Sequence, residues 1–404
     1  MTQLVRKTDD EAAALVRLGF DELRGFTESV GTMERDIAAR TFRSVPAGTP
    51  IKFVHDTVAR GVVGVLGGAA SAAGRGAGAL VERRPRPERP LSATSRGGLG
   101  ISVLNGLVGD RLEREGSPLA QPLAVRVDGL PVTPERAALA QAFPAATPRL
   151  VVFLHGLMES ERGWHVGGRD DYGTRLARDL GCTPLYVRYN SGRHISENGR
   201  SLSDLLGPVV AEWPVEVEDV ALVGHSMGGL VARSACHIAA LDEAPWVENV
   251  RHVISLGSPH MGAPLEQAVH YLSAGLHRLP ETRMMSTFLR RRSAGIRDLR
   301  QGSLVDEDWR DRDPEALRAA ACREVPLLDG ATHCFVSATV TRSPRHPVGR
   351  VVGDTLVLVP SASGRSRTRK LGFEAEFGLH VGGTHHIALL NHPAVYEKLH
   401  AWLS

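Results

Sequence analysis

Several features that would point to particular classes of protein are scarce or missing in this 404-residue sequence. It has four cysteines, none in a C-x-x-C pair, so neither a disulfide framework nor a cysteine zinc site is indicated. No H-E-x-x-H pattern occurs either, and we assign no metal and no cofactor. Aromatic residues make up 5% and the formal charge is only +3, which argues against nucleic acid as a partner.

The sequence also shows no N-terminal leader and no long apolar segment. Acidic residues occur within the first ten positions, before the apolar core of a secretory signal could form. The most membrane-like stretch, 61–74, has fourteen residues, whereas a helix that spans a bilayer needs about 20. Because the four cysteines are also expected to be free and buried, the sequence predicts a cytoplasmic protein without a transmembrane segment.

Composition divides the chain into three regions. Residues 1–81 show helical apolar spacing, 82–100 form a Pro/Arg/Gly-rich linker, and 101–404 form an α/β domain. The N-terminal helices either pack on the α/β domain or offer an apolar surface to lipid or to a partner. The sequence leaves both alternatives open, as it does the oligomeric state.

Within the α/β domain, short apolar runs alternate with helical patterns. This alternation predicts a doubly wound, mostly parallel sheet that begins with antiparallel strands around the Asp128-Gly129 turn. The expected parallel strands are 149–154, 183–189, 220–223, 250–256 and 333–340, and the expected helices are 101–115, 172–180, 202–213 and 394–403. A helical insertion at about 264–330 is either a lid over the strand ends or ordinary helical packing.

One segment has the order strand, tight turn, helix that defines a nucleophile elbow. The apolar run 220–223 leads into Gly224-His-Ser-Met-Gly-Gly229, with Ser226 at the apex. Gly224 and Gly228 stand where side chains would clash in such a turn. The N–H of Met227 begins the following helix, where it could stabilise a developing oxyanion.

A serine hydroxyl needs a base to remove its proton and an acid to orient that base. In the order serine, acid, histidine, the best candidates are Asp354, in the loop after the strand 333–340, and His386, before the last helix. His385 is the alternative base, but it would project away from the core. At the end of the strand 149–154, the N–H of Leu157 is the natural second oxyanion donor.

These segments resemble α/β-hydrolase lipases and esterases, most closely the bacterial triacylglycerol-lipase and GPI-inositol-deacylase-like branch, over about residues 120–404. The resemblance is carried by the Ser226 elbow together with Phe153-Leu-His-Gly-Leu157, Gly257-Ser-Pro-His-Met-Gly-Ala-Pro264, Gly353-Asp-Thr-Leu-Val357 and His386-Ile-Ala-Leu-Leu390.

The resemblance implies an α/β-hydrolase fold with Ser226 as nucleophile, Asp354 as acid, His386 as base, and Leu157 and Met227 as oxyanion donors. It implies a small-molecule ester or lipid as substrate, with peripheral lipid contact through the lid or the N-terminal helices as one arrangement. The signal peptide and calcium site common in secreted members are not visible. Two other functions stay open: an acyltransferase with the same triad, and a non-catalytic binding protein on this fold.

Overall fold

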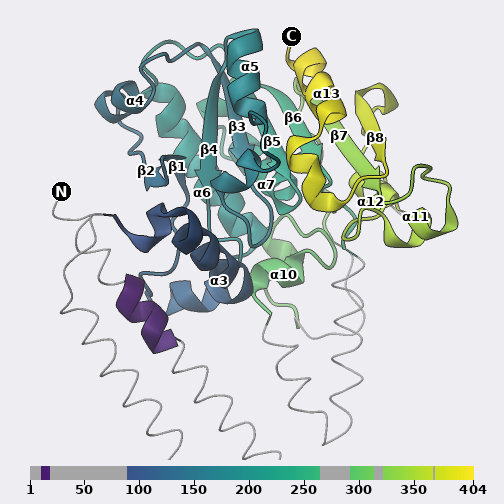
Figure 1. Ribbon diagram of the computed structural model, residues 1–404, viewed down its shortest axis with the longest axis horizontal. Helices are drawn as coiled ribbons and strands as arrows, with labels where there is room; N and C mark the ends of the chain where they lie inside the picture. The colour runs from purple at the N-terminus through teal and green to yellow at the C-terminus, as the bar shows by residue number, and fades with distance from the viewer. Residues whose placement is uncertain (1–10, 19–88, 264–291, 314–321, 367–368) are drawn as a thin grey trace, which may run out of the picture. The chain divides into compact units, whose positions relative to one another are not determined.

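A computed structural model of the chain describes residues 11–18, 89–263, 292–313, 322–366 and 369–404 (Figure 1). The chain divides into two units. One comprises residues 1–94, 116–119 and 268–291, and the other comprises 95–115, 120–267 and 292–404. In the first unit, residues 11–18 are helical, and the Glu11 carboxylate accepts hydrogen bonds from the N–H and the hydroxyl of Ser92. The rest of the predicted N-terminal helices, and residues 264–291 of the predicted lid, lie outside the described residues.

The second unit contains one eight-stranded sheet in the order β2-β1-β4-β3-β5-β6-β7-β8. β1 pairs antiparallel with β2 and β4, and all other neighbours are parallel, as the sequence predicts. The strands are β1 (Ala124–Val127), β2 (Leu130–Pro131), β3 (Arg149–Leu154), β4 (Thr183–Arg188), β5 (Asp219–His225), β6 (Val250–Leu256), β7 (Thr332–Thr339) and β8 (Gly378–Gly382).

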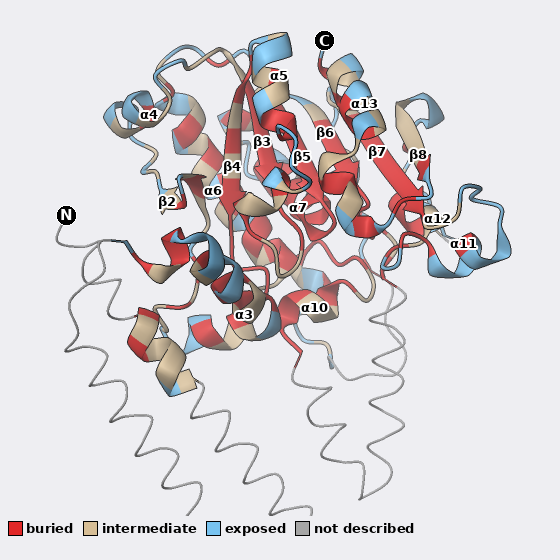
Figure 2. Cartoon of the chain, viewed as in Figure 1, coloured by how far each residue is buried: buried red, intermediate tan, exposed pale blue. Residues whose placement is uncertain are grey.

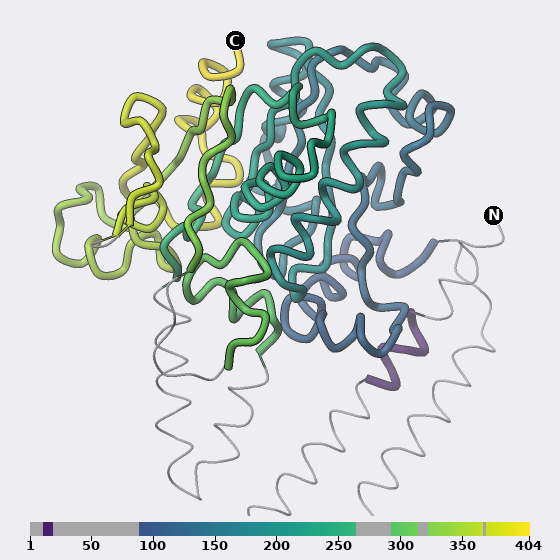
Figure 3. The backbone as a smooth tube through the Cα atoms, turned by 180° about the vertical axis from the view of Figure 1, so that it is seen from behind, coloured from purple at the N-terminus to yellow at the C-terminus, as the bar shows by residue number. Residues whose placement is uncertain are grey.

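Both faces of the sheet are covered by helices, which explains the continuous apolar runs of its central strands. Along β3, Leu150, Val152 and Leu154 belong to one core cluster, whereas Val151 and Phe153 belong to the other. The first cluster includes α6 (Ile195–Ala211) and α7 (Met227–Leu241), and the second includes α5 (Tyr172–Leu180) and α13 (Pro393–Leu403). Figures 1 and 3 show these two faces from opposite sides.

The remaining helices and 3-10 turns complete the unit. They are α3 (Ser95–Arg114), α4 (Arg136–Ala142), η2 (Glu161–His165), η3 (Pro245–Asn249), α10 (Ala294–Asp298), η5 (Asp306–Asp308), α11 (Pro347–Val352), α12 (Val359–Ala362), η6 (Ala375–Phe377) and η7 (His386–Asn391), while η1 (Leu91–Ala93) belongs to the first unit. Within the described part of the chain, no helix combines the length and apolar character needed to cross a bilayer. All four cysteines are buried free thiols, as predicted.

Two helix starts and one strand differ most from the sequence prediction. α3 begins at Ser95, inside the stretch predicted to be a linker, and α6 begins at Ile195 rather than at 202. The strand β8 was not predicted. Each segment is rich in glycine or polar residues and therefore lacks the apolar periodicity from which an element is predicted. Close packing positions α6 instead, since a Cβ on Gly199 would lie 2.3 Å from the Ser234 hydroxyl of α7.

The later part of the predicted insertion packs on the core. Leu299, Leu304, Val305 and Val325 join the α6/α7 core cluster. The Ser234 hydroxyl donates to the carbonyl of Leu304, and the Asp298 carboxylate accepts from the N–H of Ile195 at the start of α6. The role of the whole insertion, about 264–330, as a lid stays a prediction.

Candidate active site

Ser226 occupies a strained turn between β5 and α7. Its backbone has φ 52° and ψ −119°, a conformation that costs a non-glycine residue about 1–3 kcal/mol, and its N–H donates to the carbonyl of Leu256 at 2.8 Å. The turn is tight because its two glycines lack a Cβ. A Cβ on Gly228 would lie 2.3 Å from the carbonyl oxygen of Leu154, and one on Gly224 would lie 2.2 Å from the nitrogen of Gly229. The serine predicted to be the nucleophile therefore lies at the carboxyl end of the central strand.

The loop after β3 leaves one N–H without a described acceptor. The N–H of Gly156 donates to the Glu159 carboxylate at 2.8 Å, and that of Met158 donates to the Ser191 hydroxyl at 3.1 Å. The N–H of Leu157 between them has no acceptor among the described groups, and the same holds for the N–H of Met227 at the start of α7. A Cβ on Gly156 would lie 3.0 Å from the Ser226 Cβ, so the loop and the elbow are in close contact.

Asp354 and His386 form a buried pair. His386 Nδ1 lies 2.7 Å from Asp354 Oδ2, and the two side chains are 2% and 1% exposed. The other carboxylate oxygen accepts from the N–H groups of Leu356 and Val357, and the backbone N–H of His386 donates to the Asp354 carbonyl. The acid is thus held on three sides, whereas His385 is exposed.

The imidazole of His386 lies beside the elbow. A Cβ on Gly257, the residue after Leu256, would lie 3.2 Å from both Cε1 and Nδ1 of His386. Its ring centre is 4.7 Å from that of His225, the residue before the serine. Its Nε2 is buried and has no hydrogen-bond partner among the described residues. The ring therefore carries one nitrogen bound to the acid and one available to a hydroxyl.

Sequence reasoning missed a second buried pair, Glu159 and His225. His225 Nδ1 lies 3.1 Å from Glu159 Oε2, and His225 Nε2 lies 3.2 Å from the carbonyl oxygen of His386. Both ring nitrogens face acceptors, which fits a doubly protonated imidazolium. The same carboxylate oxygen also accepts from Gly156, so the pair connects the Leu157 loop, the elbow and the His386 loop.

The pKa values of this pair shift in opposite directions. Burial opposes the ionisation of Glu159, but the charge and hydrogen bond of His225 outweigh it and lower the pKa of Glu159 to about 2. Burial also opposes charge on His225, yet Glu159 raises the pKa of His225 above its usual value. Both residues stand beside recognisable motifs, since His225 precedes Ser226 and Glu159 follows Gly156 by three positions. Their spacing in the sequence, however, does not indicate that they contact each other.

His155, which ends the apolar run of β3, has a structural role. Its Nε2 accepts from the N–H of Tyr189 and its Nδ1 donates to the carbonyl of Gly156. Burial lowers the pKa of His155 to about 4, so the ring is neutral at pH 7. No cluster of three or more His, Cys, Asp or Glu side chains within the described ranges is arranged to hold a metal ion.

A serine elbow at the carboxyl end of the central strand of a parallel sheet, followed by an acid after β7 and a histidine after β8, defines the α/β-hydrolase fold. Residues 147–313 match the family described as the PGAP1-like alpha/beta domain, which belongs to this superfamily. The sequence matches none of the curated proteins with which it was compared.

Solved structures similar to this chain include bacterial and archaeal lipases and esterases. The mature form of lipase BlEst2 from Bacillus licheniformis is 18% identical, with a TM-score of 0.40 over 65% of this chain and 93% of that one. Staphylococcus hyicus lipase is 14% identical, with a TM-score of 0.35 over 64% and 92%. The Pyrococcus furiosus esterase PF2001 is 16% identical, with a TM-score of 0.37 over 64% and 84%. At these identities the likeness concerns the fold alone.

The elbow glycines give a first prediction. The variant Gly228→Ala should lose at least about 2 kcal/mol of unfolding free energy in urea denaturation, because its methyl group would meet two main-chain carbonyls. Gly207→Ala on α6 is the matched control. The nearest atom to its Cβ is 4.0 Å away, so this helix position should tolerate alanine or gain up to about 1 kcal/mol. Equal stability of the two variants would contradict the close approach at the elbow.

The Glu159–His225 pair gives a second prediction, on pH. Because the pKa of Glu159 falls from its ordinary value of 4.5 to about 2 on folding, its ionised form stabilises the protein above pH 4.5. That stabilisation is lost as the pH falls from 4.5 towards 2. Glu159→Gln should therefore cost on the order of 3 kcal/mol at pH 7, with the gap to the wild type narrowing in this acidic window.

Urea denaturation at pH 7, 4.5 and 3 measures this gap. Glu216→Gln, at an exposed position, is the control and should track the wild type at every pH. A deficit of Glu159→Gln that does not change with pH would show that the carboxylate contributes through packing rather than through its charge.

Proposed function

We propose that the protein is a serine hydrolase that cleaves carboxylic esters through an acyl-enzyme on Ser226. In this assignment Asp354 is the acid, His386 is the base, and the N–H groups of Leu157 and Met227 form the oxyanion hole. The observation that carries it is the buried hydrogen bond between Asp354 and His386, beside an elbow that holds a serine in strained geometry.

The hydrogen bonds of His386 support its role as base. Asp354 is held as an acceptor by two main-chain N–H groups, so Nδ1 of His386 is the nitrogen that carries the proton. Nε2 is then left with its lone pair, and it has no other partner in the described part of the protein. This tautomer is the one needed to accept the proton of a serine hydroxyl.

The chemistry then proceeds in two halves. As the Ser226 Oγ attacks the ester carbonyl carbon, its proton passes to His386 Nε2, and the negative charge moves to the carbonyl oxygen. The tetrahedral intermediate collapses, the C–O bond to the alcohol breaks, and Nε2 protonates the departing alkoxide. A water molecule, deprotonated by His386, attacks the acyl-enzyme, and the acid leaves as Ser226 recovers its proton.

The two free N–H groups fit the charge that develops on the carbonyl oxygen. They come from separate elements, one from the loop after β3 and one from the N-terminus of α7, where the helix dipole adds positive potential. Because all neighbouring N–H groups of the β3 loop already have acceptors, the donor at Leu157 is singled out by the fold. Removing one such donor typically costs about 2.7–4 kcal/mol of transition-state stabilisation.

A third prediction concerns activity. Ser226→Ala should abolish labelling by a fluorophosphonate probe and lower the turnover of a p-nitrophenyl ester by at least about 10⁴-fold, because the covalent route is lost. Asp354→Asn should retain the serine but reduce turnover by a similar factor, since the amide would favour the wrong tautomer of His386.

Two controls make this test specific. Ser201→Ala removes a hydroxyl on α6 outside the site and should behave like the wild type, while His385→Ala should differ little and His386→Ala should be inactive. Wild-type turnover by a folded Ser226→Ala variant would overturn the proposal. Product analysis with added alcohols would separate hydrolysis from acyl transfer by the same triad.

A further inference from the structure

The segment from Arg342 to Phe373 is strongly basic, with more net positive charge than the chain as a whole. It contains seven basic residues and one acid, Asp354, whereas the whole chain has 48 basic and 45 acidic residues. We call this segment the cationic arm. Its basic residues are Arg342, Arg345, Arg350, Arg365, Arg367, Arg369 and Lys370, and all but Arg367 lie in described residues.

The six described cations of the arm form no ion pair with any acid in the described part of the chain. Several surface arginines elsewhere pair with carboxylates, as Arg114 does with Asp110 and Arg200 with Asp242. By contrast, none of the six described cations of the arm lies within ion-pair distance of a described acid. The arm's own acid, Asp354, is buried and engaged with His386. Five of these six cations, Arg342, Arg345, Arg350, Arg365 and Lys370, are exposed, whereas Arg369 is half-buried with a buried Nε.

Exposed aliphatic side chains interleave with these cations. Val348, Val351 and Val352 on α11 are 50%, 74% and 40% exposed, and Leu356 in the following turn is 36% exposed. Figure 2 shows α11 largely in the colour of exposed residues, in contrast with the buried strands. Four of the nine exposed large apolar residues found in the described part of the chain thus fall within one short stretch.

The arm is fixed to the sheet. The N–H of Val340, after β7, donates to the carbonyl of Gly353, and the N–H of Gly383, after β8, donates to the carbonyl of Thr341. A Cβ on Gly349 would lie 2.1 Å from the Thr341 hydroxyl, so α11 packs directly on the start of the arm. The apolar and basic side chains are consequently displayed on a rigid support, which lowers the entropy cost of binding.

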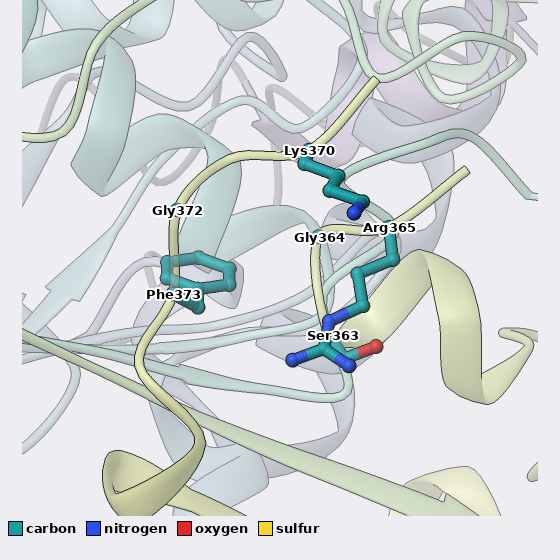
Figure 4. Close-up of a pocket in the computed structure, with 6 residues that line it drawn as sticks. All are labelled: Ser363, Gly364, Arg365, Lys370, Gly372 and Phe373. Carbon is teal, nitrogen blue, oxygen red and sulfur yellow. The ribbon is translucent and has the colours of Figure 1, made fainter. Parts of the chain in front are cut away.

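A hollow opens in the second half of the arm. It has a volume of about 270 Å³ and is lined by Ser363, Gly364, Arg365, Lys370, Gly372 and Phe373. Figure 4 shows Arg365 and Lys370 on one side and the Phe373 ring on the other. Two cations and an aromatic wall suit a small anionic group attached to an apolar remainder. α11 and α12 lie near this part of the chain, at the β7/β8 end of the sheet (Figures 1 and 3).

The arm also borders the catalytic pair. Asp354 lies two residues after Val352 in the same turn, and its carbonyl accepts from the N–H of His386. Ile387, the next residue, is 43% exposed, so another aliphatic side chain lies beside the turn. Whatever binds the outer face of this turn is therefore held close to the acid and the base.

We propose that the cationic arm docks on the surface of an anionic phospholipid bilayer, with its arginines at the headgroup phosphates and the α11 valines inserted between them. Alternating cations and aliphatic side chains suit a lipid interface, where cations contact the anionic headgroups and aliphatic side chains enter the apolar boundary below them. A surface that binds nucleic acid would be expected to carry aromatic side chains for base stacking rather than exposed valines. The idea that the bilayer also supplies the ester substrate rests on the proposed function. The docking of the arm on the bilayer is independent of that function.

Sedimentation with lipid vesicles tests the proposal on the full-length protein. Binding to phosphatidylglycerol vesicles should exceed binding to phosphatidylcholine vesicles by at least about tenfold, and it should weaken in 1 M NaCl, where charge interactions are screened. The triple variant R342Q/R345Q/R350Q should lose on the order of a hundredfold in affinity, since each cation near such a surface contributes about fivefold. V351S/V352S should weaken binding to both kinds of vesicle.

Matched controls separate local from general effects. R114Q/R178Q/R200Q makes the same change in net charge at exposed positions elsewhere, and V215S/L241S removes two exposed aliphatic side chains elsewhere; both should bind like the wild type. All variants should keep wild-type fluorophosphonate labelling of Ser226, which reports an intact site without lipid.

The outcomes for docking and for catalysis are independent. Equal affinity of the wild type for both kinds of vesicle, or equal losses in the arm and control variants, would overturn the docking proposal whatever the activity. Vesicle binding that depends on the arm, in a protein that does not react with the probe, would keep the docking proposal and reject the esterase assignment.

Discussion

The close contact between the elbow and the strand β3 is the constraint on which the site depends. Gly228 approaches the carbonyls of Leu154 and His155 so closely that no side chain fits. A Cβ on Gly156 would lie 3.0 Å from that of Ser226, a less severe but still tight contact. This contact places the end of β3 against the start of α7. Two N–H groups from distant parts of the chain, at Leu157 and Met227, consequently border one serine. The strain in the Ser226 backbone is balanced by the packing of the parallel sheet around it.

The Glu159–His225 ion pair is a second constraint on the site. Glu159 and His225 are costly to bury separately, and each is stabilised by the other and by main-chain groups. The pair lies between the β3 loop and the His386 loop and makes hydrogen bonds to both. The Glu159 carboxylate accepts from Gly156 in the Leu157 loop, while the His225 ring contacts the carbonyl of His386. The Leu157 loop and the His386 loop are thereby both fixed relative to His225, the residue before Ser226.

How much the sequence predicts depends on whether a feature is local. The elbow and the central strands are local patterns, in which apolar runs end at glycines, and they lie where the sequence indicates. Asp354 and His386 follow from chain order, because parallel strands bring their carboxyl ends to one edge of the sheet. The structure brings these two together and leaves His385 exposed. The catalytic role assigned to them is still a proposal.

Features that depend on contacts distant in sequence could not be predicted. The strand β8 is five residues long, with glycine at both ends, and forms because Gly378 fits against the ring of Phe335. The first turns of α6 bury small or polar residues such as Ser196, Asn198 and Gly199, so this part of the helix lacks an apolar stripe. Glu159 and His225 are 66 residues apart, and no spacing rule relates them. In each case the determining partner belongs to another element.

The distribution of charge joins the two proposals physically. A formal charge of +3 suggests an unremarkable surface, yet one segment is strongly basic and its only carboxylate is turned inward. The turn 352–356 therefore has two faces with different chemistry. Its inner face holds Asp354 against His386, and its outer face displays Val352 and Leu356 beside unpaired arginines. Main-chain hydrogen bonds join Gly353 to Val340 after β7 and Asp354 to His386 after β8. A surface bound outside this turn would therefore lie close to the His386 imidazole inside it. An ester held at such a surface would be presented to the site without rearrangement of the catalytic pair.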